Sequence, residues 1–379
     1  MKAPFRPVKT AVIGCGMISD IYLKNMVEVF QVLDVVGCSD LIAQRAQEKA
    51  EKYGIRAMSN EEILSDPEIE LVVNLTYPTA HFDVSRAALL AGKNVHSEKM
   101  FAITLQQADE LRRIAEQKGL LLTAAPDTWL GGRLQTARQI VDSGLIGTPI
   151  SAEIALQRCY RHSDWKKEGE KRFAFCPGGG YINDMGGYYL TGLVSMLGGI
   201  RRVTGFYRTY EPARPYRHPQ NPLYGEMMTY DQAPNCYAAA LEFECGLLCG
   251  LSMTSEVRGG GSRYALHGTE GTLHLDDPNN FGGPLEIELA GGGGRKEIPL
   301  TYPYTGNMRG LGAADTAYAL RNGRRPRCDV DLIYHVFEAA KGIEISCDTG
   351  SVYTLKSRCR RPRPLEPGYM EYPELMLDL

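Results

Sequence analysis

The sequence predicts an α/β protein in which a parallel sheet, wound on both faces by helices, is followed by a second domain. Three observations predict this. Short apolar runs alternate with helical patterns through residues 10–126, as strands and helices do around a parallel sheet. A glycine-rich turn follows the first apolar run. The length of 379 residues exceeds what one hydrophobic core usually serves, which favours two domains.

The elements of the first domain follow from hydrophobic periodicity. Apolar and β-branched runs predict five strands, at residues 10–16, 33–40, 69–76, 94–100 and 120–126. Apolar spacing or Ala/Glu/Lys-rich composition predicts four helices between them, at residues 17–30, 41–54, 81–93 and 105–119. We therefore expect a first domain over residues 1–126 and a second over residues 127–379.

The glycine-rich turn "GCGMIS" predicts a dinucleotide site. Gly14 allows a tight turn, and Gly16 lets the backbone approach a pyrophosphate at the positive end of a helix. Ser19 replaces the third glycine of the usual pattern and is still small enough for close packing. The motif follows the first strand and opens the first helix, as this mechanism requires. We expect Gly14, Gly16, Met17 and Ile18 to contact the cofactor.

Asp40, at the end of the second strand, favours NAD as the cofactor. A carboxylate 21 residues beyond Ser19 can accept hydrogen bonds from both hydroxyls of the adenine ribose. It would repel the 2′-phosphate of NADP, and no arginine immediately follows it. The alternative is that Asp40 only caps the next helix.

Two further strand ends supply polar groups to the predicted cleft. Ligands of such a sheet bind outside the carboxyl ends of its strands, which here are "NLTYPTAH" and "HSEKM". We expect Thr76 and Tyr77 to line this crevice. Glu98 and Lys99 line it too, and because neighbouring residues alternate sides, one can face the cofactor and the other the reacting carbon. The alternative is a surface ion pair of little energetic weight. For His81, a role beside the cofactor and a capping role are both open.

Composition excludes several other classes of protein. The net charge of −3 gives no electrostatic footprint for nucleic acid or an acidic membrane surface. No apolar run reaches the roughly 20 residues needed to span a bilayer. The ten cysteines are dispersed, and the pair Cys245 and Cys249 has no histidine cluster nearby, so we expect no metal site. This cysteine usage indicates the reducing cytoplasm.

The order of these motifs is similar to that of the Gfo/Idh/MocA oxidoreductases, the family of glucose–fructose oxidoreductase and inositol dehydrogenase. The similarity rests on the glycine turn, Asp40, "LTYP…H" and "AGKNVHSEKM", and extends to "YALHGTEGTLHL" and the segment "GRRPRCDVDLIYHVFEAAKGIEISCDTGS". Met100 stands where the family has proline in Glu-Lys-Pro. The resemblance implies a Rossmann domain followed by an α+β domain with a large, mostly antiparallel sheet. It also implies that Glu98 binds the nicotinamide ribose, that Lys99 acts at the substrate hydroxyl, and that Asp127 lies near the cofactor.

The segment "CPGGGYINDMGGYYL" supplies the other half of the predicted site. Asp184 and Tyr188 are four residues apart and therefore share one helix face. The family usually has Asp-x-x-x-His here, so Tyr188 stands in place of the histidine. A tyrosine, with an ordinary pKa of about 10, needs a nearby cation to act as a base, and Lys99 can supply it. We expect Lys99 and Tyr188 to accept the proton as a couple in which either group can be the one that titrates, while Asp184 orients the sugar and Lys99. The alternative is that Tyr188 is a core aromatic residue.

The loop "LQRCYRHSDWKKEG" offers further substrate contacts. Arg158, His162 and Trp165 combine charged donors with an aromatic face, which suits a polyol. An ordinary surface role for each of them is equally open.

These residues predict an NAD-dependent dehydrogenase that removes a hydride from a secondary hydroxyl of a pyranose sugar or glycoside. Oxidation of the C3 hydroxyl of a glucoside to a 3-keto sugar is the sharpest form of this prediction. An inositol or inosose dehydrogenase, or a keto-sugar reductase, is an alternative. A non-catalytic NAD-binding regulator is an alternative of another class. The resemblance further implies a homodimer or homotetramer, because the broad face of the second sheet pairs subunits in the family.

Overall fold

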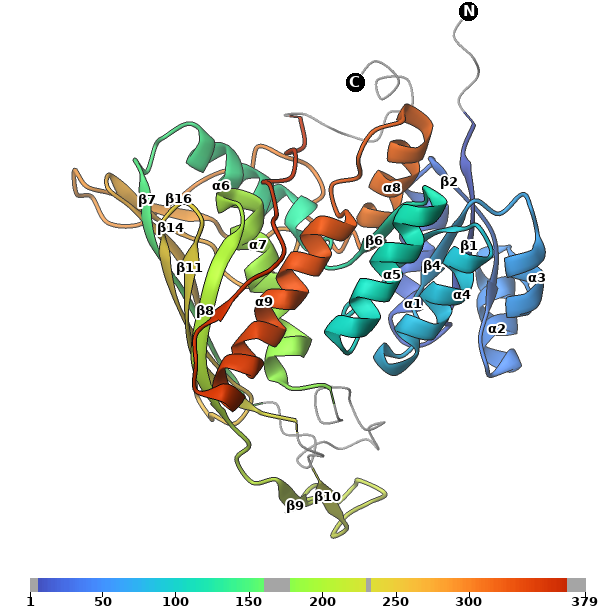
Figure 1. Ribbon diagram of the computed structural model, residues 1–379, viewed down its shortest axis with the longest axis horizontal. Coiled ribbons are helices and arrows are strands. Elements are labelled where there is room, and N and C mark those ends of the chain that lie inside the picture. Colours follow the sequence, from blue (N-terminus) through green and yellow to red (C-terminus); the bar gives the residue numbers. More distant parts are fainter. Residues whose placement is uncertain (1–5, 160–177, 230–232, 367–379) are drawn as a thin grey trace, which may run out of the picture.

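The computed structural model describes residues 6–159, 178–229 and 233–366 of the chain. Figure 1 shows two lobes side by side, each organised around one sheet. The sequence predicted this combination of a parallel sheet and a mostly antiparallel one, and the structure confirms it.

The first sheet has six parallel strands in the order β3-β2-β1-β4-β5-β6. Its strands are β1 (Val8–Ile13), β2 (Leu33–Ser39), β3 (Arg56–Ala57), β4 (Leu71–Asn74), β5 (Asn94–Ser97) and β6 (Leu122–Ala124). The helices between them are α1 (Ser19–Glu28), α2 (Ala43–Tyr53), α3 (Asn60–Ser65), α4 (His81–Leu90) and α5 (Leu105–Lys118). Every residue of β4 is buried, as expected for a parallel strand covered on both faces.

The second sheet has nine strands in the order β16-β15-β14-β13-β7-β12-β11-β8-β17. They are β7 (Pro149–Gln157), β8 (Ile200–Arg208), β11 (Cys236–Phe243), β12 (Leu248–Thr254), β13 (Ser262–Gly268), β14 (Gly271–His274), β15 (Glu286–Leu289), β16 (Lys296–Glu297) and β17 (Tyr353–Thr354). Only β7 and β12 run parallel. The short strands β9 (Ala213–Pro215) and β10 (Met227–Thr229) form a separate ribbon.

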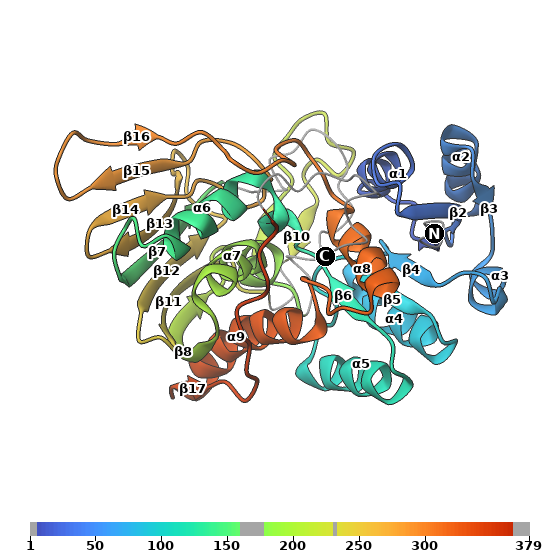
Figure 2. The same ribbon diagram turned by 90° about the horizontal axis from the view of Figure 1, so that it is seen from above.

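Helices cover one face of this second sheet. In Figures 1 and 2, α6 (Gly132–Asp142), α7 (Gly187–Leu197) and α9 (Val330–Thr349) lie on the side that faces the other lobe. Accordingly, Ala152, Ile154 and Leu156 of β7 are buried, while the residues between them are partly exposed.

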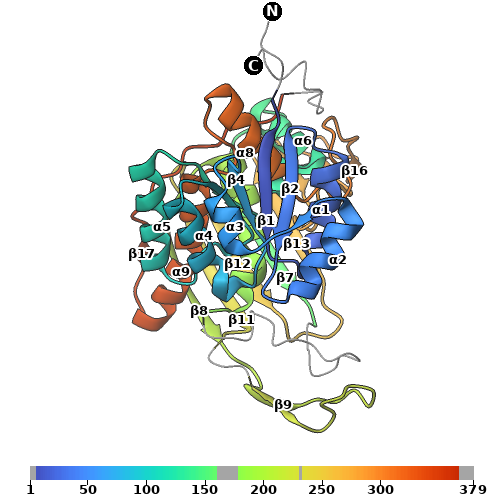
Figure 3. The same cartoon turned by 90° about the vertical axis from the view of Figure 1, so that its right-hand side faces the viewer.

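The last part of the chain returns to the first lobe. Helix α8 (Leu311–Asn322) packs against β5 and β6, and α9 touches both β6 and β8. Figure 3, which looks at the first lobe, shows α8 and α9 behind the parallel sheet. Arg321 of α8 forms an ion pair with Glu70, at 2.6 Å, beside β4. Within the described residues, no helix is long and apolar enough to cross a membrane.

Candidate active site

The glycine turn packs tightly against the end of β4. Gly14 has a φ of +105°, and a Cβ there would lie 2.5 Å from the carbonyl carbon of Leu75, so the position requires glycine. A Cβ on Gly16 would meet nothing within 4 Å, which means that Gly16 faces open space. The hydroxyl of Ser19 donates to the Gly16 carbonyl at 2.6 Å and helps to fix the turn.

Asp40 connects the glycine turn to the end of β2. Its Oδ2 accepts a hydrogen bond from the Cys15 N–H at 2.7 Å, and its Oδ1 accepts one from the Ile42 N–H at 2.8 Å. The carboxylate remains partly exposed. It therefore anchors two loops and can still present oxygen lone pairs to a ligand.

A cavity of about 470 Å³ opens between these loops and the end of β4. Seven of the ten residues predicted to bind the cofactor line it: Gly14, Gly16, Met17, Ile18, Asp40, Thr76 and Tyr77. The cavity lies outside the carboxyl ends of β1, β2 and β4, where doubly wound sheets bind their ligands. Its open glycine floor and its carboxylate fit a dinucleotide whose adenine ribose offers hydroxyl donors. The predicted residues His81, Glu98 and Asp127 do not line this cavity.

His81 is a buried residue that joins two strand ends. Its Nδ1 lies 2.7 Å from the carbonyl oxygen of Met100, and its Nε2 lies 2.9 Å from that of Thr76. Burial lowers the pKa of the His81 imidazole, and a neutral ring donates to only one of these carbonyls. His81 therefore fixes the loop after β4 relative to the loop after β5.

Glu98 follows β5 and is held by donors on both of its oxygens. The Tyr22 hydroxyl donates to Oε1 at 2.7 Å, and the Lys99 N–H donates to Oε2 at 2.9 Å. The residue is 9% exposed. This buried carboxylate therefore lies directly beside Lys99 with a fixed orientation.

Lys99 reaches across to the second lobe. Its Nζ donates to the Asp184 carbonyl at 2.7 Å and to Asp184 Oδ1 at 3.0 Å. It also lies 5.2 Å from the centre of the Tyr188 ring. Burial lowers the pKa of Lys99, but attraction to Asp184, Tyr188 and Glu98 outweighs it, and the net shift is upward. The group is a charged ammonium at neutral pH.

Asp184 lies in a widened helical turn, and Tyr188 lies in the helix that follows it. Residues Ile182–Gly186 form a π-helical turn, η5, that continues into α7. The sequence predicted an ordinary α-helix here. The structure instead has a π-helical turn, which is wider than an α-helical turn and is often found at functional sites. Both residues still face Lys99. Burial raises the pKa of the Tyr188 phenol, while Lys99 and Arg309 oppose that rise.

Arg309 is a site residue that the sequence analysis missed. It lies in the loop before α8, and its positive charge opposes the rise in the pKa of Tyr188. Its guanidinium also donates to Asn279 Oδ1 at 2.6 Å and to Asn307 Oδ1 at 2.7 Å. The only local signal is an Arg-Gly pair before an alanine-rich run, which does not reveal the distant tyrosine.

Asp127 follows β6 and holds the start of α8. Its Oδ2 accepts hydrogen bonds from the N–H groups of Gly310 and Gly312, both at 3.0 Å. Burial raises the pKa of Asp127 to about 6, although these two hydrogen bonds oppose the rise. The carboxylate thus positions the loop that carries Arg309.

The predicted substrate contacts are only partly described. Arg158, just after β7, pairs with Asp277 through Nη2 and Oδ2 at 2.8 Å, and its side chain is 39% exposed. His162 and Trp165 lie outside the described residues. Among the residues that are described, no group of three or more His, Cys, Asp or Glu side chains is arranged to hold a metal ion.

Comparison with known proteins gives matches over both lobes. Residues 8–125 match the family model described as an oxidoreductase family with an NAD-binding Rossmann fold. Residues 134–274 match the GFO/IDH/MocA C-terminal domain. Together these matches cover more than half of the chain.

Curated relatives align with only part of the chain. An uncharacterized oxidoreductase of Schizosaccharomyces pombe is 32% identical over 206 residues, which are 52% of this chain and 54% of that protein. An inositol 2-dehydrogenase of Salmonella typhimurium is 30% identical over 148 residues, which are 38% of this chain and 44% of that protein. The chain therefore spans about half the length, or less, of the curated relatives it matches.

Solved structures share the fold over nearly the whole chain. An NAD-binding oxidoreductase from Klebsiella pneumoniae aligns with a TM-score of 0.78 and 19% identity, over 92% of this chain and 98% of that one. A levoglucosan dehydrogenase in complex with NADH aligns with a TM-score of 0.80 and 17% identity, over 93% of this chain and 100% of that one. At these identities the likeness establishes the fold alone.

Proposed function

Because this chain belongs to the Gfo/Idh/MocA family of NAD-binding oxidoreductases, we propose that it is a cytoplasmic dehydrogenase acting on a secondary hydroxyl of a pyranose sugar or glycoside. The sharpest form of the proposal is oxidation of the C3 hydroxyl of a glucoside to a 3-keto sugar. One observation carries it. The ammonium of Lys99, at the end of a cofactor-domain strand, contacts both Asp184 and Tyr188 of the other lobe.

The protein's task in alcohol oxidation is to accept the hydroxyl proton, since bound NAD supplies the hydride acceptor. Tyr188 is the proposed proton acceptor. Burial disfavours its phenolate, but the charges of Lys99 and Arg309 favour it. Because Lys99 and Tyr188 interact directly, the pair titrates as one unit. This charge arrangement supports proton transfer at the Tyr188 hydroxyl.

Asp184 is proposed to orient both the catalytic lysine and the substrate. One of its oxygens holds the Lys99 ammonium, and its carboxylate is 22% exposed, which leaves it accessible to a sugar hydroxyl. Arg158, His162 and Trp165 are proposed as further contacts to the polyol. For Arg158, the half-exposed guanidinium beside Asp277 supports this assignment.

On the cofactor side, Glu98 is proposed to bind the nicotinamide ribose. Its buried position next to Lys99 supports this, because the reacting ring and the substrate must meet at the lysine. His81 and Asp127 are proposed to act indirectly. Each positions a loop of the site through buried hydrogen bonds.

Oxidation of a cyclitol is the second candidate function. The partial similarity to inositol 2-dehydrogenase of Salmonella typhimurium favours it, and a cyclitol presents the same secondary hydroxyl to the same residues. Reduction of a keto-sugar is the same chemistry in the opposite direction. A non-catalytic NAD-binding regulator is disfavoured by the retention of Lys99, Asp184 and Tyr188 together.

The test is NADH formation, followed by absorbance, with NAD and a panel of methyl β-D-glucopyranoside, D-glucose and myo-inositol. We expect at least one pyranose to reduce NAD and Lys99→Met to abolish the signal. Lys118→Met, at an exposed position at the end of α5, is the matched control and should behave as the wild type. Tight NAD binding without reduction by any sugar or cyclitol would favour the regulator instead.

The face of the second sheet that points away from the helices is proposed to pair subunits into a homodimer or homotetramer. Small residues lie side by side on it, as Ala238 opposes Ser252 and Ala240 opposes Gly250. Phe206 is 82% exposed there. A flat, partly apolar surface of this kind suits self-association. Sedimentation of the wild type and of Phe206→Glu tests the proposal, and an unchanged oligomer in the variant would place the interface elsewhere.

A further inference from the structure

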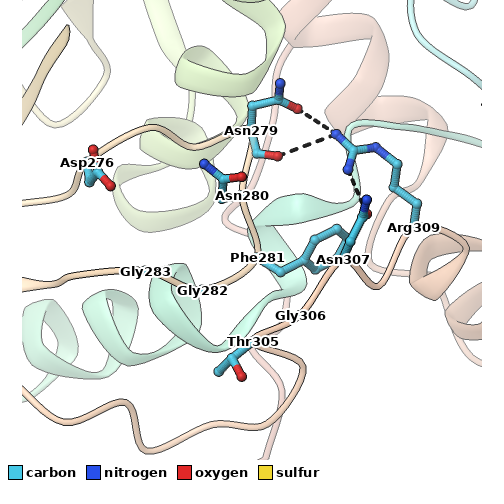
Figure 4. A pocket seen from close by; sticks show the side chains of 10 residues that line it. All are labelled: Asp276, Asn279, Asn280, Phe281, Gly282, Gly283, Thr305, Gly306, Asn307 and Arg309. Atoms are coloured by element: carbon cyan, nitrogen blue, oxygen red, sulfur yellow. Dashed lines mark hydrogen bonds between the residues drawn. The ribbon is translucent and has the colours of Figure 1, made fainter. Parts of the chain in front are cut away.

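A second cavity, of about 320 Å³, lies between the loop that follows β14 and the loop that precedes α8. Figure 4 shows its lining, which includes the side chains of Asp276, Asn279, Asn280 and Asn307 together with the guanidinium of Arg309. None of these five residues was singled out by the sequence. The volume is at the lower end of the roughly 300–1,000 Å³ typical of small-molecule sites.

Arg309 joins this cavity to the candidate reaction centre. The same guanidinium that lines the cavity lies close enough to the phenol of Tyr188 to oppose the rise in its pKa. One residue thus separates the cavity from the proposed proton acceptor. A substrate whose oxidised sugar ring lies beside Tyr188 could therefore place a further group in this cavity.

The lining mixes hydrogen-bond donors with acceptors. Arg309 can only donate, so Asn279 and Asn307 each turn their amide oxygen toward it. The NH₂ groups of these two asparagines then remain available to donate hydrogen bonds to a ligand. The Asn280 side chain makes no hydrogen bond with any described residue, and the Asp276 carboxylate is 45% exposed and makes only a long contact, 3.4 Å, with Arg133. Hydroxyl groups, which donate and accept, match such a lining better than a phosphate, which only accepts.

The walls of the cavity are fixed in place by the protein. Arg133, whose side chain is completely buried, donates to the backbone carbonyls of Asp277 and Asn280. The Arg133 N–H donates to the carbonyl of Phe281 at 3.1 Å. The opposite wall is held by Arg309 itself. Because the two charges of the lining, Asp276 and Arg309, have opposite signs, a neutral ligand suits the cavity.

We propose that this cavity is a subsite for an uncharged, hydroxyl-rich group, namely a second sugar ring linked to the ring that is oxidised. The expected effect on turnover rests on the proposed function, whereas the expected binding of the second ring does not. The subsite should make a two-ring glycoside a better substrate than a one-ring glycoside. Asn280 and Gly306 are the residues at which binding to the subsite can be separated from the reaction, because within the described residues neither forms a hydrogen bond with Arg309 or Tyr188.

The experiment compares cellobiose with methyl β-D-glucopyranoside on the full chain with bound NAD. Asn280→Ala removes one amide from the lining. Gly306→Tyr adds bulk at a position where a Cβ would meet only the Met308 methyl group, at 3.6 Å, so the variant should fold. We expect kcat/KM for cellobiose to fall about tenfold in each variant and that for the methyl glucoside to change less than twofold. Gln117→Ala, at an exposed position on α5, is the control.

Binding to the NADH complex, measured by calorimetry with cellobiose and with glucose 6-phosphate, separates this proposal from the proposed function. One outcome would support the subsite while removing the proposed reaction. In it, cellobiose binds the wild type, binds Asn280→Ala at least fivefold more weakly, and is not oxidised by either protein. Equal losses for one-ring and two-ring sugars would overturn the subsite. So would tighter binding of glucose 6-phosphate than of cellobiose, or a wild type that binds no cellobiose.

Discussion

The candidate cofactor cavity and the proposed reaction centre are built in different ways. The candidate cofactor cavity is formed by loops at neighbouring strand ends of one sheet, where the glycines Gly14 and Gly16 leave backbone exposed and one carboxylate, Asp40, connects two of the loops. The reaction centre is formed by side chains from separate segments of the chain, among them Lys99, Tyr188 and Arg309.

This difference indicates what each region tolerates. A surface made of backbone is sensitive to added atoms, because a methyl group collides with neighbouring backbone or occupies the ligand's place. A cluster of charged side chains is sensitive to lost charge, because the remaining charges are left buried without a partner. Substitutions at four main positions, Lys99, Gly14, Asp127 and Arg309, test this contrast, beginning with the one that should change activity most.

Loss of the Lys99 charge should have the largest effect. In Lys99→Met we expect kcat/KM to fall by about 10³ or more, since the residue supports general-base transfer worth roughly 10²–10⁴. NAD affinity should stay within about threefold of the wild type, because Lys99 does not line the cofactor cavity. Steady-state kinetics and NAD titration measure the two quantities. If kcat/KM and NAD affinity fell by similar factors, the two regions would not be functionally separable.

An added methyl group at Gly14 should damage the cofactor region through stability. The left-handed φ of +105° alone costs a non-glycine residue about 1–3 kcal/mol, and the contact with Leu75 adds to this. Gly16→Ala is the matched variant. A Cβ there meets nothing within 4 Å, so its unfolding free energy should be unchanged while NAD binds at least tenfold more weakly. Urea melts and NAD titrations distinguish these results, and equal destabilisation by both substitutions would refute the assignment of Gly16 to the ligand surface.

Asp127 connects the two regions, and its protonation should be visible in the stability of the protein. Its folded pKa of about 6 lies above the ordinary value of 3.8, so the folded state binds more protons between these values. Stability from this group is therefore fully present at low pH and is lost as pH rises from about 4 to 6, by up to about 3 kcal/mol.

Asp127→Asn keeps an acceptor oxygen for the start of α8 but cannot titrate. The unfolding free energy of the variant minus that of the wild type should therefore rise through this pH window and level off above it. Urea melts at pH 4, 5, 6 and 7 measure the difference. A difference that does not change with pH would mean that Asp127 has an ordinary pKa.

Arg309→Met should have the smallest effect, a shift in pH dependence. Removal of this cation leaves Lys99 to oppose the effect of burial, so the pKa of Tyr188 should rise. The ascending limb of the kcat/KM profile should move to higher pH by about one unit, equivalent to about 1.4 kcal/mol. Arg309→Lys, which keeps the charge, should recover part of the shift. An unshifted limb in the methionine variant would remove Arg309 from the proton-transfer group.

Local features of the sequence were sufficient to predict seven of the residues that line the candidate cofactor cavity. The glycine turn and Asp40 lie next to the strands that position them, so their spacing alone indicated the site. The six-residue helix α3 was missed although Ser59 and Glu62 form a capping box, a pattern visible in sequence. The two-residue strand β3 was missed because so short a strand has no period to detect.

The reaction centre could be anticipated only in part. The family resemblance and the four-residue spacing predicted Lys99, Asp184 and Tyr188, which the structure brings together; their catalytic role stays a prediction. Arg309 and the partners of Asp127 were not found, because they depend on where α8 packs. That contact joins residues far apart in the chain and leaves no local pattern.

The return of α8 to the parallel sheet has a consequence for how the chain matures during synthesis. The side of β5 and β6 that α8 covers carries His96 and Thr123, which are fully buried in the folded chain. It stays uncovered until residues 311–322 have emerged from the ribosome. The cofactor-binding lobe therefore cannot complete its fold as a nascent N-terminal unit. A fragment that ends at residue 126 would expose this surface and aggregate, whereas co-expression of the missing C-terminal piece should rescue it.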